Sequence, residues 1–145
     1  MASFNAVDLY TKSRHLGGYG NATVVHGSVT PTAATALDVF RPVMIPAGVE
    51  VTSVRIVNDD LAASALAVKI GYEPVNAADG PTADDDYFVA TGSTILQTAG
   101  TTELAFRPIK FEKPVFLTIT VTTTAVTFAS GNITAIVTGD GIGVK

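Results

Sequence analysis

Few side chains in this sequence are of the types that carry out chemistry. The chain has no cysteine, and His15 and His26 are its two histidines. A catalytic triad would need one of them beside a nucleophilic serine and an orienting carboxylate, yet the sequence has no G-x-S-x-G elbow. It also has no H-x-x-x-H pair for a metal. Val24, Val25 and Val29 flank His26, which favours a structural, hydrogen-bonded imidazole. We therefore predict no catalytic residue.

One charge cluster could offer oxygen ligands to a cation such as Ca²⁺. It consists of Asp79 followed by Asp84, Asp85 and Asp86. An EF-hand loop needs acids at alternating positions, a central glycine and a distal glutamate, and this segment lacks that spacing. Because charge runs are commonly solvated, we expect a solvated loop or the start of a short helix at residues 87–89. No metal and no cofactor are predicted.

Length and composition indicate one domain that has much apolar surface to bury, in its core or against partners. The chain has 145 residues, 47% of them hydrophobic and 15% charged, against about 25% charged in typical soluble domains. No apolar run is long enough for a transmembrane helix, and the polar segment Met1 to His15 does not resemble a signal peptide. Such a chain either has a large core or covers apolar surface with partners. We expect both.

Charge argues against nucleic acid as a partner. The formal net charge is −4, and the nine lysines and arginines are scattered along the chain. Nucleic-acid binding depends on clustered basic residues that neutralise phosphates. We therefore expect no nucleic acid and no membrane among the partners.

The elements that must position these side chains are strands, because valine, threonine and isoleucine dominate between turns rich in glycine, proline and Asn-Asp. About eight short strands at regular spacing predict a sandwich or barrel. We expect an all-β, jelly-roll-like antiparallel β-sandwich over residues 21–145, preceded by an N-terminal arm over residues 1–20. Residues 87–99 are ambiguous between strand and helix. The expected strands cover residues 22–30, 35–43, 49–58, 65–73, 102–109, 115–123, 126–129 and 132–138.

Two segments show clear period-two patterns. In residues 65–73, Leu66, Val68, Ile70 and Tyr72 share one face, with Lys69 and Glu73 opposite. In residues 115–123, the inward face carries Val115, Leu117, Ile119 and Val121, and the outward face carries Phe116, Thr118, Thr120 and Thr122. An outward threonine row either meets another subunit or simply faces solvent. The predicted partner-binding residues are Phe116, Thr118 and Thr120 of this row, and Phe4, Leu9, Tyr10 and Arg14 of the arm.

Four sequence phrases together resemble small head proteins of tailed bacteriophages. They are residues 45–49 leading into 53–59, residues 67–72, residues 83–89 and residues 111–115. The chain is similar, from about Ile45 to Val121, to capsid decoration (cement) proteins with a jelly-roll core. The resemblance implies a structural protein, made in the host cytoplasm, that binds the virion exterior. It implies the major capsid protein as partner, and we expect self-association as a homodimer or homotrimer.

Two other functions remain open from the sequence. A tail or fibre module that binds carbohydrate or another virion protein would need a shallow aromatic patch, for which Tyr72, Tyr87 or Phe88 are available. A small hydrolase on a β-sandwich would have to use His15 or His26.

Overall fold

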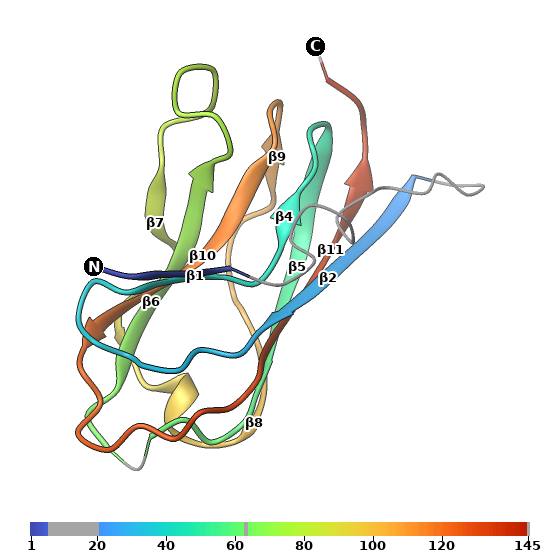
Figure 1. Cartoon of the computed structure of the whole chain (residues 1–145). Coiled ribbons are helices and arrows are strands. Elements are labelled where there is room, and N and C mark those ends of the chain that lie inside the picture. The colour runs from blue at the N-terminus through green and yellow to red at the C-terminus, as the bar shows by residue number, and fades with distance from the viewer. Residues whose placement is uncertain (6–20, 63, 145) are drawn as a thin grey trace.

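The chain folds into two β-sheets packed face to face (Figure 1). The computed structural model describes residues 1–5, 21–62 and 64–144. Within these ranges the one helical element is a single 3₁₀ turn, η1 (Ile95–Gln97). No helix in the described part of the chain is long and apolar enough to cross a membrane.

Each sheet collects strands from distant parts of the sequence. In the first sheet the order is β1-β3-β10-β6-β7, with β4 also paired to β10. In the second the order is β2-β11-β5-β8, with β9 also paired to β5. The strands of the first sheet are β1 (Ser3–Asn5), β3 (Val39–Arg41), β4 (Met44–Ile45), β6 (Ala67–Pro74), β7 (Asp84–Ser93) and β10 (Val115–Thr123). Those of the second are β2 (Ala22–Val29), β5 (Val49–Asn58), β8 (Gly100–Glu103), β9 (Ile109–Phe111) and β11 (Ile133–Gly141).

The pairing is that of a jelly roll. Strands β6 and β7 form the innermost antiparallel pair, β5 pairs with β8 and β9, β10 pairs with β3 and β4, and β2 pairs with β11. Because β3 and β4 share one partner, and β8 and β9 share another, each set is one interrupted strand. Eight nested strands remain, as in a double-sheet jelly roll. The predicted sandwich is confirmed.

Proline accounts for both interruptions, because it has no N–H to donate to a ladder. Pro42 separates β3 from β4, and Pro108 precedes β9. At the first break the two sheets approach each other closely. A Cβ on Gly27 of β2 would lie 2.2 Å from the Pro42 carbonyl oxygen, so only glycine fits there.

The core lies between the sheets and follows the predicted alternation. Along β6, Val68, Ile70 and Tyr72 are buried, and along β10 every second residue from Val115 to Val121 is buried on the predicted inward face. Leu66, just before β6, is also buried. Burial of these β-branched and aromatic side chains is the main term that holds the sheets together.

Several expected elements differ in detail. The strand expected at residues 35–43 is confined to Val39–Arg41, because Leu37 lies in a turn at φ +72°. The ambiguous segment is strand β7 up to Ser93, and the helical alternative is wrong for residues 87–89. Residues 126–129 contribute a single bridge, Phe128 to Ala62. The last strand continues to Gly141, beyond its expected end.

Candidate partner-binding surfaces

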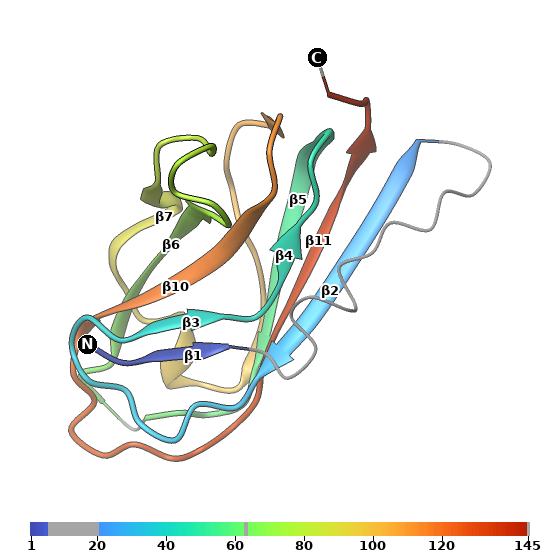
Figure 2. The same cartoon turned by 45° about the horizontal axis from the view of Figure 1, so that its top comes forward.

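Of the predicted partner contacts in the arm, Phe4 is the one among the described residues, and it lies in a strand. β1 runs parallel to β3 at the edge of the first sheet, with Phe4 opposite Phe40 (Figure 2). The two rings meet edge to face with centroids 5.6 Å apart, and Phe4 is half-buried. Leu9, Tyr10 and Arg14, and also His15, lie outside the described residues, so a partner contact through them stays a prediction.

Asp38 fixes the position of β1, a role that the sequence pattern did not reveal. Its Oδ1 accepts a hydrogen bond from the Ala2 backbone N–H at 2.8 Å. Its Oδ2 accepts from the Thr35 N–H at 3.0 Å and from the Thr35 hydroxyl at 2.7 Å. Burial by itself would raise the pKa of Asp38, but these hydrogen bonds outweigh it and lower the pKa below its ordinary value.

The outward row of β10, for which the sequence left open a subunit contact or a solvent-facing surface, is shielded from solvent by the chain itself over three of its residues. Phe116, Thr118 and Thr120 expose 7%, 2% and 7% of their surface. Phe116 packs against Met44 and Val75, and the two threonines line a shallow hollow of about 240 Å³ on the outer face of the first sheet. A partner contact at these three residues stays a prediction.

A bulged start of β7 helps to cover that outer face. A Cβ on Gly71 of β6 would lie 2.0 Å from the Asp84 carbonyl oxygen, so the β7 backbone passes directly over this glycine. Asp85 then reaches Lys69, with the ammonium nitrogen and carboxylate oxygen 2.6 Å apart. An ion pair between Arg41 and Glu73 bridges β3 and β6 across β10.

The rings considered for a carbohydrate platform are mostly interior. Tyr72 and Phe88 are 9% and 3% exposed, and Tyr72 packs edge to face on Phe111 with centroids 4.8 Å apart. Tyr87 is half-buried, and its hydroxyl donates to the Arg107 carbonyl at 2.9 Å. These residues form an aromatic cluster between the sheets rather than a flat exposed platform.

The acidic segment is divided between the two faces of the first sheet. Asp85 pairs with Lys69, and Asp79 pairs with Lys113 at 2.9 Å. Within the described ranges no three His, Cys, Asp or Glu side chains are grouped as metal ligands. His26, predicted to be a structural imidazole, is instead exposed on the outer face of the second sheet, opposite Ile136.

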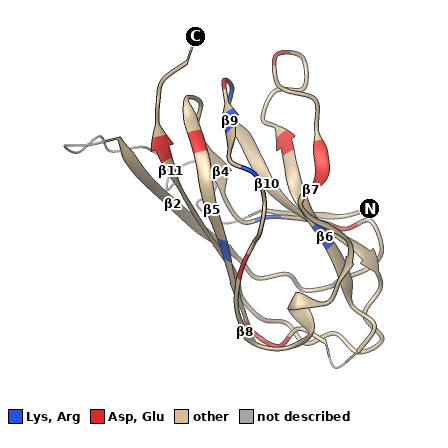
Figure 3. Cartoon of the chain, turned by 180° about the vertical axis from the view of Figure 1, so that it is seen from behind, with Lys and Arg blue, Asp and Glu red and all other residues tan. Residues whose placement is uncertain are grey.

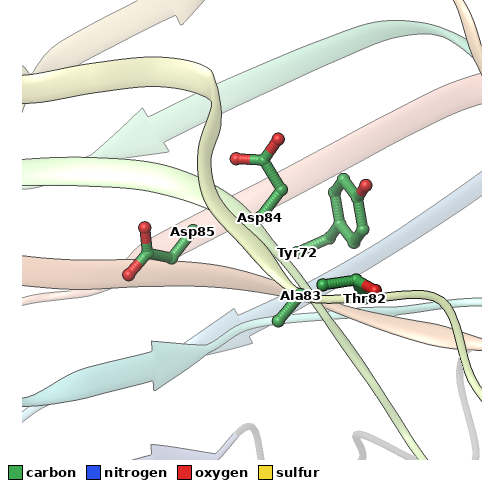
Figure 4. Close-up of a pocket in the computed structure, with 5 residues that line it drawn as sticks. All are labelled: Tyr72, Thr82, Ala83, Asp84 and Asp85. Atoms are coloured by element: carbon green, nitrogen blue, oxygen red, sulfur yellow. The ribbon is translucent and has the colours of Figure 1, made fainter.

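Asp84 occupies a different position from the other aspartates. It is the cross-strand partner of Tyr72, so the two side chains share the inner face at the end of the sandwich. Figure 4 shows the Tyr72 hydroxyl and the Asp84 carboxylate projecting to the same side, with Asp85 directed away. The two residues, with Thr82, Ala83 and Asp85, line a hollow of about 450 Å³. Burial, and then the charge of Asp84 and the neighbouring Tyr87, raise the pKa of Tyr72.

Charged residues are sparse on the described strands (Figure 3). Both signs occur, and large parts of both sheets carry neither. On the outer face of the second sheet Arg55 pairs with Glu103 at 3.1 Å, and Ser53 donates to the same carboxylate, which lowers the pKa of Glu103.

The fold therefore belongs to the double-sheet jelly rolls, and solved structures of this fold resemble it over nearly its whole length. A chain in the capsid of Ralstonia phage GP4 matches with a TM-score of 0.75 at 18% identity, covering 99% of this chain and 100% of that one. A chain in the capsid asymmetric unit of cyanophage Pam1 matches with a TM-score of 0.66 at 24% identity, covering 88% and 90%.

A third similar chain comes from the acid-stable capsid of Helicobacter pylori bacteriophage KHP30. Its TM-score is 0.55 at 17% identity, with 82% of this chain and 86% of that one covered. A scan of protein-family models and a search of curated protein sequences found no match. At these identities the comparisons establish the shared fold.

Proposed function

We propose that this chain is a non-enzymatic bacteriophage capsid protein that binds the outside of the icosahedral shell and cements neighbouring major capsid subunits. The observation that carries the proposal is the match to a chain of the Ralstonia phage GP4 capsid across the full length of both chains. A chain of comparable length and the same fold therefore occurs in a capsid structure.

Features of the chain itself support a docking role. Charged residues make up 15% of the chain, a low share for a soluble domain. Exposed apolar side chains occur at Val24, Leu37, Val126, Ile142 and Val144. Scattered over the surface, these residues provide apolar contact area for shell subunits.

Binding many copies to the assembled shell stabilises it by mass action, because the ligand favours the assembled state over free subunits. Self-association into a homodimer or homotrimer would strengthen the effect through multivalency. The protein would be made in the host cytoplasm and reside on the virion exterior.

The test uses purified virions and shells that lack this chain. Mass spectrometry of virions should find the chain at a copy number comparable to that of the major capsid protein. Added protein should bind the shells and raise their disruption temperature. A chain that is absent from particles and does not bind shells would refute the proposal. Removing residues 1–20 tests the arm: undiminished binding would exclude Phe4, Leu9, Tyr10 and Arg14 as contacts.

The carbohydrate-binding alternative has less support. It needs exposed aromatic rings, whereas Tyr72 and Phe88 are buried. Reproducible binding of the pure chain to immobilised glycans would support this alternative.

A further inference from the structure

We propose that β2 is the surface through which two copies of this chain associate, by antiparallel pairing of β2 with β2 of the second copy. The inference deepens the proposed function, on which it rests for the expectation of self-association, and it selects the homodimer. Because β2 ends the second sheet, this pairing joins the second sheets of both copies into one continuous sheet, with the two β2 strands at its centre.

The first argument is that β2 is a regular strand at an open edge. Its register with β11 runs from Ala22–Asp140 to Val29–Ile133 without a shift. A regular strand directs backbone N–H and C=O groups to both of its sides. On the side away from β11, no described strand pairs with β2. A row of such groups is a template on which another strand can pair.

The second argument is that the other strands that end the two sheets are protected against such pairing. β1 has three residues and β8 has four. β7 begins with three aspartates, and its pairing with β6 is interrupted by two register shifts. Short length, charge and bulges are the features that discourage association of sheet edges. β2 has none of them, because its eight residues include no Lys, Arg, Asp, Glu or Pro.

The third argument concerns the identity of the partner. The formal net charge is −4, so two copies of the chain repel each other on average. Residues 22–29 of β2 and 133–139 of β11 carry no Lys, Arg, Asp or Glu (Figure 3), and two copies that meet there bring no like charges together. A strand of a shell subunit would have to match β2 in length and in its faces, whereas a second copy matches by identity. Because the remaining edges are protected, association stops at two copies.

The burial pattern of β2 restricts the register of the pair. Val25 and Val29 are buried toward the core, whereas Ala22, Val24 and His26 are exposed on the outer face. Directly opposite residues of an antiparallel pair share one face, so inward residues must oppose inward ones. A twofold axis at Val25 meets this condition, retains residues 22–28 and sets Val24 opposite His26 of the second copy. An axis at His26 would set two imidazoles opposite each other, which repel when protonated.

Sedimentation velocity of the full chain over a dilution series tests the dimer, and it should show a monomer–dimer equilibrium. Val24→Lys should weaken dimerisation at least about fivefold, because the dimer contains the change twice. Thr101→Lys places the same charge at an exposed position of β8, at the other edge of the same sheet, and should stay within about twofold of the parent. A monomer at every concentration, a trimer, or equal weakening by both variants would overturn the proposal.

Cross-linking tests the register, and the chain has no cysteine of its own. Opposite residues of an antiparallel pair have Cα atoms about 4.5–5.5 Å apart, which a disulfide can join. Under mild oxidation, a mixture of Val24→Cys and His26→Cys copies should therefore form a disulfide-linked dimer. A mixture of Val24→Cys and Thr101→Cys copies should not. No cross-link in the first mixture, or equal cross-linking in both, would overturn the pairing.

Hydrogen exchange separates a second copy from coverage of the edge by the same chain. Amide hydrogens of residues 24–28 that point away from β11 should exchange more slowly as the protein concentration rises. Protection that is already complete in the monomer would overturn the proposal. Urea denaturation of each variant establishes that it is folded.

Shell binding then separates this proposal from the proposed function. A chain that dimerises through β2 but does not bind shells would refute the cement function alone. A chain that binds shells as a monomer would refute the pairing of β2 and leave the cement function intact.

Discussion

The carboxylate of Asp38 joins β1 to the turn before β3 through three accepted hydrogen bonds. We expect Asp38→Asn to lower the free energy of unfolding by about 1–3 kcal/mol at pH 7, because the amide nitrogen cannot accept from the donors that one carboxylate oxygen now satisfies. Urea denaturation measures this. Asp60→Asn, an exposed acid, is the matched control and should change little.

Asp38 also predicts a dependence on pH. The pKa of Asp38 is lowered in the folded chain. Its contribution to the free energy of unfolding is therefore complete above the pKa of the unfolded chain, about 3.9, and is lost as the pH falls through the pKa of the folded chain. The parent should therefore lose more stability than Asp38→Asn between pH 6 and pH 2. Equal losses in urea denaturation series at several pH values would contradict this role.

Gly71 provides a steric prediction. Any Cβ at this position would meet the Asp84 and Asp85 backbone at 2.0–2.6 Å, so Gly71→Ala must displace the start of β7. We expect a loss of about 1–3 kcal/mol or more, as in overpacked cores. Gly100→Ala is the control, because a Cβ there meets nothing within 4 Å. Both are measured by urea denaturation, and equal effects would argue against the close approach.

At the scale of elements, β1 is a short edge strand of the first sheet with few contacts. It has three residues, of which Phe4 is half-buried, and next to it the Val39 N–H donates a hydrogen bond to the Ala2 carbonyl. Regions with so few buried contacts open locally at low free energy. In a hydrogen-exchange experiment, Phe4→Ala should accelerate the exchange of the Val39 amide hydrogen. It should leave the Leu117 amide, which bonds to Val43, unchanged. Acceleration of both would indicate global destabilisation instead.

The sequence predicted those elements in which the alternation of apolar and polar residues is unbroken. It was less informative where contacts between strands determine the structure. The alternation of β6 and β10 located both strands and the faces that they turn to the core. β7 was ambiguous because bulges interrupt its pairing with β6 and remove the period-two signal. For the outward row of β10 the sequence left open a subunit contact or a solvent-facing surface. It could not predict shielding by the chain itself, because the passage of the β7 backbone over Gly71 is not encoded in the local sequence of β10. The Tyr72–Asp84 pair depends on the same bulged register, so its two members could not be matched from spacing.

At the scale of the whole molecule, the nested pairing joins strands far apart in sequence. β2 and β11 are register partners over eight residue pairs, from Ala22–Asp140 to Val29–Ile133. Folds dominated by such non-local pairs fold slowly, commonly in milliseconds to seconds. Stopped-flow refolding from urea should show a main phase in this range. A microsecond main phase would contradict the nested topology as the rate-limiting feature.

The position of β11 between β2 and β5 has a consequence for biosynthesis. The ribosome delivers this strand last among those of the roll, yet both neighbours need it to satisfy their facing backbone groups. A nascent chain that lacks residues 133–141 therefore exposes two open strand edges, which are templates for aggregation. Chaperones that shield unfinished chains, and prompt release from the ribosome, should matter more for the yield of this protein than its modest length suggests.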